Sequence, residues 1–226
     1  MENKMWLIWK QPKSRRRYKI GTLSYLDNSY KFCYVNPELD EAQKDGFKYF
    51  PGFDDINNVY ESDELFANIA TRLPNVSRSD YLEILNLYNL DKTSSKFDIL
   101  RATRGRLLTD NYEFVPVFNP NKVEFDVAGT RHCFNTKENY ELIKENDKLL
   151  LELEPDNQYD KNAIKVILCK NNKKYKLGYV PRYYASELAS ILKNNVKYSA
   201  LVKGLNFNSE ISGEDITVFV KIIINN

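Results

Sequence analysis

A short segment rich in proline and asparagine, residues 116–121, divides the sequence into two nearly equal halves. Proline disrupts the interior of a helix and is disfavoured in a central strand. Helices and strands are therefore expected to end at this segment. The chain has 226 residues, which is enough for two small domains. We therefore predict one domain over residues 1–117 and a second over residues 122–226.

The composition narrows the class of protein. Hydrophobic residues make up 42% of the chain, enough for a packed core. No apolar run is long enough to span a membrane, and charges interrupt the apolar stretch in MENKMWLIWK, unlike a secretory signal. Three cysteines without a CxxC pair and a single histidine, His132, argue against disulfides, structural zinc or a histidine dyad. We expect a cytoplasmic protein without metal or cofactor.

The first half alternates between strand and helix signals. Its early runs predict strands, two of them joined by a turn at residues 27–29, and an acidic stretch dotted with glycine and proline then leads to Tyr60. Apolar residues at helical spacing predict three helices after it. The predicted strands are Met5–Trp9, Lys19–Leu26 and Tyr30–Val35, and the predicted helices are Asp63–Leu73, Ser79–Asn89 and 95–105. This pattern predicts a β-barrel or sheet with three helices.

The second half contains several short strands and one or two helices. The strands are expected at Val123–Gly129, Lys148–Glu154, Ala163–Cys169, Tyr175–Val180, Val196–Leu205 and Ile216–Ile224. The helices are expected at Lys137–Glu145, with Thr136 as a cap, and at Tyr183–Leu192 after Pro181. Short strands with few helices are typical of a small OB-like or SH3-like barrel. The whole chain is thus predicted to be α+β.

The charges are arranged in blocks although the net charge is only +2. Residues 138–160 contain eight acids and two lysines, and residues 161–182 contain seven basic residues and no acid. One interpretation is a basic face that binds an anionic partner. The other is that the neighbouring blocks neutralise each other in the fold.

Two polar segments follow predicted strands in the second half. Residues 154–162 form a loop with an aromatic, carboxylates and amides directly before an apolar strand. Residues 129–133 likewise end a strand in polar groups. Because asparagine and aspartate build turns, a purely structural loop with Tyr159 packed beneath it is the alternative to a binding loop.

These segments resemble the HIRAN domain family. The motifs are Gly129-Thr130-Arg131-His132-Cys133, the long run from Pro155 to Val166, and Leu177-Gly178-Tyr179-Val180-Pro181, and the match covers about residues 122–225. The resemblance implies a modified OB barrel that binds single-stranded DNA and captures a free 3′ end. It does not imply catalysis.

The resemblance also implies roles for individual residues. Arg131 would contact the phosphate backbone, Tyr159 the terminal nucleotide and Asp160 the 3′-hydroxyl. Other candidate contacts within the motifs are His132, Asn157, Asn162, Lys165 and Tyr179. His132 and Cys133 stand where end-binding members have an aromatic pair, and of these His132 can still stack on a base.

The first half resembles the N-terminal subdomain of HipA-type kinases over about residues 15–115. The similar motifs are Ile20-Gly21-Thr22-Leu23 with Tyr30–Tyr34, Phe66-Ala67-Asn68-Ile69 with Leu73-Pro74, and Phe97-Asp98-Ile99-Leu100 with Gly105-Arg106. In that family the subdomain is not catalytic and contacts the kinase core and the antitoxin. The resemblance implies, as an alternative function, a protein-interaction regulator of a HipA-like kinase in a toxin–antitoxin system.

Catalytic motifs do not stand out in the sequence. It contains neither GxGxxG nor GxxxxGK[ST]. His132 and Cys133 would face opposite sides of a strand, which disfavours a Cys–His pair. Acids near residues 152–160 leave a metal-dependent nuclease as a weaker alternative. The sequence therefore predicts a non-enzymatic protein that binds single-stranded DNA near a 3′ end.

Overall fold

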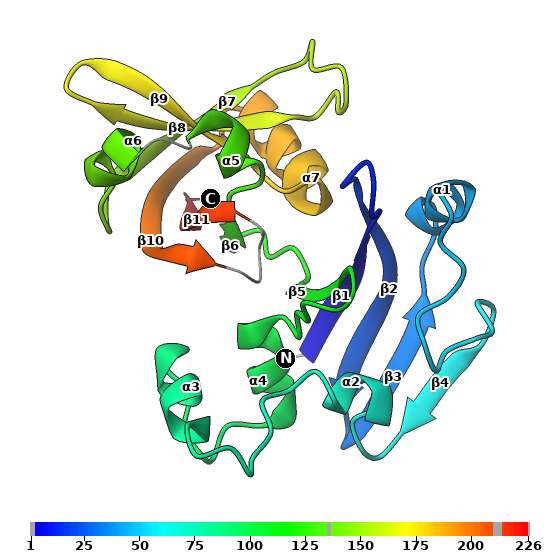
Figure 1. The fold of residues 1–226 in the computed structure, drawn as a ribbon. Helices are drawn as coiled ribbons and strands as arrows, with labels where there is room; N and C mark the ends of the chain where they lie inside the picture. The colour runs from blue at the N-terminus through cyan, green and yellow to red at the C-terminus, as the bar shows by residue number, and fades with distance from the viewer. Residues whose placement is uncertain (1–2, 135–136, 210–213, 226) are drawn as a thin grey trace. The chain divides into compact units, whose positions relative to one another are not determined.

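The computed structural model describes residues 3–134, 137–209 and 214–225 (Figure 1). The chain divides between Val117 and Phe118 into two compact units, which we call unit 1 and unit 2. Each unit has its own antiparallel sheet and its own helices, so the predicted α+β class and two-part layout are confirmed.

Unit 1 is built on an antiparallel sheet whose strands, within the described residues, follow the order β4-β3-β2-β1-β5. Its strands are β1 (Asn3–Lys10), β2 (Arg17–Leu26), β3 (Ser29–Tyr34), β4 (Val59–Ser62) and β5 (Tyr112–Pro116). Its helices are α1 (Glu38–Lys44), α2 (Ala67–Ala70), α3 (Tyr81–Leu87) and α4 (Lys96–Thr103). The sequence predicted α2, α3 and α4 with longer bounds, but not α1, β4 or β5.

Helix α1 lies in the stretch that the sequence indicated as acidic and irregular. Its Leu39 and Ala42, three positions apart, are buried, and the helix packs against β2 (Figure 1). Three acidic residues in its first turn lie near the positive end of the helix dipole, which stabilises the helix. The helix thus forms around two apolar residues that are too few to make a clear periodic signal.

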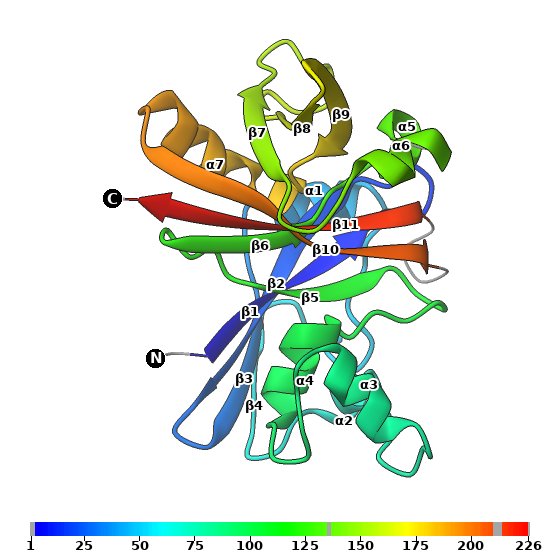
Figure 2. The ribbon, with the colours of Figure 1, turned by 90° about the vertical axis from the view of Figure 1, so that its left-hand side faces the viewer.

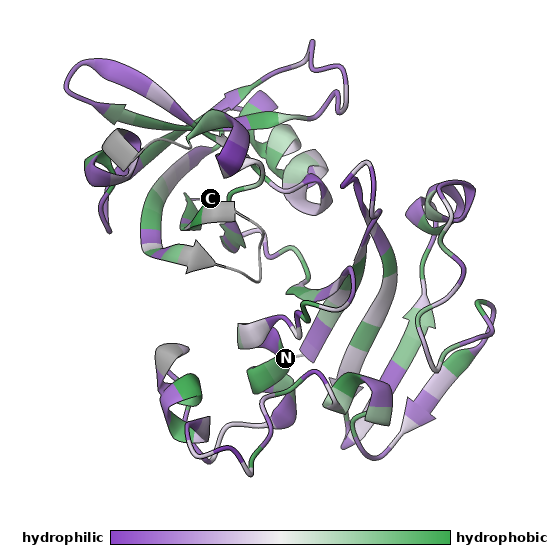
Figure 3. Cartoon of the chain, in the orientation of Figure 1, coloured by the Kyte–Doolittle hydropathy of each residue, from purple (hydrophilic) through white to green (hydrophobic). Residues whose placement is uncertain are grey.

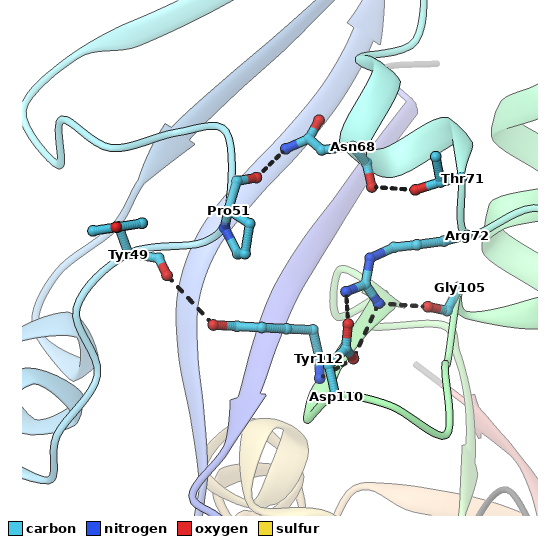
Figure 4. A network of polar contacts seen from close by, with 8 residues as sticks. All are labelled: Tyr49, Pro51, Asn68, Thr71, Arg72, Gly105, Asp110 and Tyr112. Atoms are coloured by element: carbon cyan, nitrogen blue, oxygen red, sulfur yellow. Dashed lines mark hydrogen bonds and ion pairs between the residues drawn. The ribbon is translucent and has the colours of Figure 1, made fainter.

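A buried arginine, Arg72, is held by several contacts within unit 1. Arg72 pairs with Asp110 and donates to the carbonyl of Gly105 at 2.8 Å (Figure 4). Its guanidinium also lies over the rings of Phe50 and Tyr112. Buried charges persist when they are paired and hydrogen-bonded. These contacts give Arg72 a structural role in unit 1.

A second buried charge, Glu113, lies on β5. Arg106 binds its Oε2 through Nε at 2.8 Å, Arg17 Nε lies 3.3 Å from Oε1, and Arg104 is 3.9 Å away. Burial by itself would raise the pKa of Glu113, but the guanidinium groups, Arg106 foremost, outweigh it and lower the pKa to about 2. Glu113 is therefore ionised in the folded chain.

Unit 2 is a sheet that closes on itself. Within the described residues its strand order is β6-β11-β10-β7-β8-β9, and β6, β11 and β10 run side by side in Figure 2. Ala128, just after β6, exchanges two backbone hydrogen bonds with Tyr179 at the end of β9, at 2.8 and 2.9 Å. This bridge joins the first and last strands of the order, and the predicted barrel is confirmed.

Unit 2 consists of the barrel strands and three helices within the described residues. Its strands are β6 (Lys122–Asp126), β7 (Lys148–Leu153), β8 (Ile164–Lys170), β9 (Lys173–Tyr179), β10 (Lys197–Ser209) and β11 (Glu214–Asn225). Its helices are α5 (Thr130–Cys133), α6 (Lys137–Leu142) and α7 (Arg182–Lys193). Thr136, the expected cap of α6, lies outside the described residues. Figure 3 shows hydrophilic residues over the loop between β7 and β8 and over the β8–β9 hairpin.

Candidate nucleic-acid interface

The loop between β7 and β8, residues 154–163, is shaped by its own side chains. Asn157 Oδ1 accepts from the backbone N–H groups of Tyr159 at 2.9 Å and Asp160 at 3.1 Å. Asp160 Oδ1 in turn accepts from the N–H of Asn162 at 2.9 Å. Such side-chain-to-backbone bonds replace the ladder that ended at β7. The loop projects from the barrel as a sequence of connected turns (Figure 1).

Tyr159 stands at the outer side of this loop with 88% of its surface exposed. The alternative in which Tyr159 packs beneath the loop is therefore wrong. An aromatic side chain usually buries a large apolar area, so this exposure is not explained by packing. The Tyr159 ring is therefore open to solvent.

Asp160 and Asn162 accompany Tyr159 on the same loop, and both are half-buried. One carboxylate oxygen of Asp160 holds the Asn162 amide. Within the described part of the chain, its second oxygen makes no hydrogen bond. Asp160 can therefore accept a hydrogen bond from a ligand hydroxyl without breaking the loop.

Glu154 connects the loop to the two following strands. Its Oε1 lies 2.7 Å from Lys165 Nζ on β8, and its Oε2 accepts from Asn157 Nδ2 at 2.7 Å and from the Tyr179 hydroxyl at 2.9 Å. The hydrogen bond from Lys165, followed by that from Asn157, lowers the pKa of Glu154 to about 2. Three of the predicted site residues thus meet at a carboxylate that was not itself among the predicted site residues.

Tyr179 is held on both sides at the end of β9. Its hydroxyl donates to Glu154 and accepts from Lys176 Nζ at 2.5 Å, and that ammonium also lies 4.1 Å from the ring centroid. The preceding residue, Gly178, has φ +151°, and a Cβ there would lie 2.4 Å from the carbonyl oxygen of Ala128. Only glycine lets β9 approach Ala128 closely enough to close the barrel.

Residues 129–133 form a helical turn and not the end of a strand, which corrects the sequence prediction. Gly129 at φ +76° ends the extended backbone, and the Thr130 hydroxyl fixes the turn by donating to the Ile216 carbonyl at 3.0 Å. In this turn Arg131 Nε donates to His132 Nε2 at 2.9 Å, and His132 is exposed. The helical turn α5 packs against β9, the strand that ends in Tyr179.

Three of the seven basic residues in the block 161–182 form ion pairs within the unit. Lys165 pairs with Glu154, Lys170 with Asp147 at 2.9 Å and Lys174 with Glu152 at 2.5 Å. Neighbouring blocks therefore neutralise each other in part, as one of the two interpretations predicted. Exposed lysines remain at residues 161 and 173, for which the described structure shows no ion pair.

The predicted site residues fall into two groups. The first consists of residues on the loop or bonded to Glu154, and its members are Asn157, Tyr159, Asp160, Asn162, Lys165 and Tyr179. The second is Arg131 and His132 on α5. The spacing of Glu154 and Asn157, together with a strand register that places Lys165 opposite Tyr179, is the signal that would have revealed Glu154.

A known domain family matches most of unit 2. Residues 120–222 match the model of the HIRAN domain family, and the chain therefore carries a HIRAN domain, as its motifs predicted. HIRAN domains are known as DNA-binding domains.

Two solved structures are similar to part of the chain. The HIRAN domain of human HLTF is 24% identical, over 46% of this chain and 74% of that one, with a TM-score of 0.35. A protein from Lactobacillus plantarum is 22% identical, over 46% of this chain and 92% of that one, with a TM-score of 0.34. No curated protein matches the chain.

The described residues contain neither a metal-binding cluster nor a membrane-spanning helix. No group of three or more histidine, cysteine, aspartate or glutamate side chains there is placed to hold a metal ion. None of the helices in that part of the chain has the length and apolar character needed to cross a membrane. The HipA-like resemblance of unit 1 stays a prediction.

Proposed function

We propose that the HIRAN domain of this chain binds single-stranded DNA at a free 3′ end. The observation that carries the proposal is the 88% exposure of Tyr159 on a loop whose backbone is held by Asn157. A ring held in water by an ordered loop is ready to stack on a terminal base, which contributes about 1–3 kcal/mol without reading sequence.

Asp160 gives the proposed site its preference for an end. Its carboxylate accepts a hydrogen bond from a 3′-hydroxyl, whereas a 3′-phosphate at that place would meet a like charge. The backbone of an internal nucleotide offers no hydroxyl there in DNA. Asp160 would therefore separate a free end from the interior of a strand.

Arg131 and His132 supply contacts to the strand behind the end. The guanidinium of Arg131 suits a phosphate, and the exposed imidazole of His132 offers a second ring. Both lie on α5, which packs against β9. We place this activity in the cytoplasm, a setting that the three free cysteines favour.

Fluorescence anisotropy with a labelled single strand tests the proposal. Tyr159→Ala should weaken binding about tenfold through lost stacking, and Tyr159→Phe, which keeps the ring, should bind nearly as the wild type. Asp160→Asn should weaken binding to the hydroxyl end, while Asp156→Asn, an exposed acid of the same loop, serves as the matched control. Equal binding by Tyr159→Ala and the wild type would refute the role of this loop.

A further inference from the structure

Glu154 lies at the base of the loop between β7 and β8 and bonds to groups from three segments of the chain. Its carboxylate meets Asn157 in the loop, Lys165 on β8 and Tyr179 on β9. We infer that Glu154 is a positioning residue, which acts through Asn157 to hold Tyr159 and Asp160 in the conformation that receives a strand end. Its effect on binding rests on the proposed function, but its effect on the loop does not.

The first step runs from Glu154 to the amide of Asn157. An amide side chain can face either way, with its oxygen or its NH₂ group toward a given neighbour. The 2.7 Å bond from Nδ2 to Glu154 fixes the NH₂ group toward the carboxylate. The oxygen must then face the loop, where the N–H groups of Tyr159 and Asp160 donate to it at 2.9 and 3.1 Å.

The second step fixes Glu154 itself against the barrel. Lys165 binds one carboxylate oxygen and the Tyr179 hydroxyl binds the other, and Lys165 and Tyr179 are opposite each other in the register of β8 and β9. Hydrogen bonds to a carboxylate are about twice as strong as neutral ones. The orientation of the loop is therefore set by the sheet through side chains, in addition to the backbone bond from Glu154 N to the Ala163 carbonyl at 2.8 Å.

The consequence is an ordered loop in the absence of ligand. A segment that is already in its bound conformation loses less conformational freedom when it binds. Glu154 itself has its oxygens occupied by protein donors, so it acts through Asn157 and not by touching the DNA. Loss of this carboxylate should loosen two specific amides before it affects the barrel.

Amide hydrogen exchange of the full chain without DNA, followed by NMR, tests the loop directly. Glu154→Gln should speed exchange of the Tyr159 and Asp160 amides by about tenfold, because a hydrogen bond to a charged group is lost. The amides of β8 should stay unchanged. Glu152→Gln, which breaks the comparable pair with Lys174, should leave the same two amides as in the wild type.

Each outcome decides the inference. Unchanged loop amides, or equal acceleration across the whole barrel, would overturn it. If Glu154→Gln fails to fold, Tyr179→Phe, which removes a hydrogen bond that fixes Glu154, must loosen the same two amides for the inference to stand. A loosened loop with wild-type affinity for the strand would overturn the role in binding. A loosened loop in a protein whose wild type binds no DNA would refute the proposed function and leave the positioning role of Glu154 intact.

Discussion

Binding of a DNA strand to this chain should weaken only modestly as salt is raised. Each lysine or arginine that neutralises a phosphate releases counterions, and for single strands the slope of log K against log salt is about −0.7 per contact. In the structure, three lysines already form ion pairs with carboxylates, namely Lys165, Lys170 and Lys174. Lys176 donates to the Tyr179 hydroxyl and Arg182 is half-buried, so Arg131 and the exposed Lys161 and Lys173 give about three contacts.

Three contacts predict a slope of about −2, so a rise from about 50 to about 200 mM salt should weaken binding about 20-fold. All seven basic residues of the block 161–182 would instead give a slope of about −5 and a loss near 1000-fold. Anisotropy titrations over a salt series measure the slope. Lys161→Gln should make it shallower by about 0.7, and the ion-paired Lys165→Gln should not change it. A slope steeper than about −4 would refute the assignment of ion pairs.

Two stability predictions follow from close contacts and buried charge. Gly178→Ala should destabilise unit 2 by about 3 kcal/mol or more, because its Cβ would collide with Ala128; Gly129→Ala, with open space around it, should cost about 1–2 kcal/mol in chemical denaturation. Glu113, with its pKa lowered to about 2, contributes stability above its unfolded pKa of about 4.5 that is lost as pH falls toward 2. The loss should be about 3 kcal/mol in urea unfolding, and Glu113→Gln should remove this pH dependence; an unchanged acid profile would contradict the ion-pair account.

The strands that the sequence predicted well are those with clear alternation and clear ends. Lys148–Glu154 was expected from its leucines at alternate positions, and β7 covers Lys148–Leu153. Strand β5 was missed because Tyr112–Pro116 combines a buried glutamate with a proline at its end. That glutamate is tolerated because Arg106, seven residues earlier, and Arg17, far away in the sequence, both reach it, which the pattern of the strand itself does not show.

The turn at α5 was misjudged for a similar reason. The extended chain ends at Ala128 because this residue completes the barrel. Gly129 then adopts a positive φ, which ends the extended backbone. Barrel closure depends on β9, which lies far along the sequence. Propensity within residues 123–133 alone favoured a continuing strand, since tertiary pairing decides where such a strand stops.

The candidate site was predicted in its residue types but not in its geometry. The long motif named Asn157, Tyr159 and Asp160 as candidates, and in the structure Asn157 Oδ1 accepts from the backbone N–H groups of the other two. Whether Tyr159 faced water or the core was open, because a polar loop over a buried ring has the same sequence pattern. The link from Glu154 to Tyr179 required the register of β8 and β9, which no local spacing contains.

The central claim is tested most directly by comparing two DNA strands of the same sequence that differ only in the chemical group at the 3′ end. Full-length wild-type protein is titrated against a labelled strand with a 3′-hydroxyl and against the same strand with a 3′-phosphate. We predict that the hydroxyl strand binds at least about tenfold more tightly, because Asp160 accepts from the hydroxyl and repels the phosphate. Equal affinities, or tighter binding of the phosphate strand, would contradict the proposal that this HIRAN domain recognises a 3′ end.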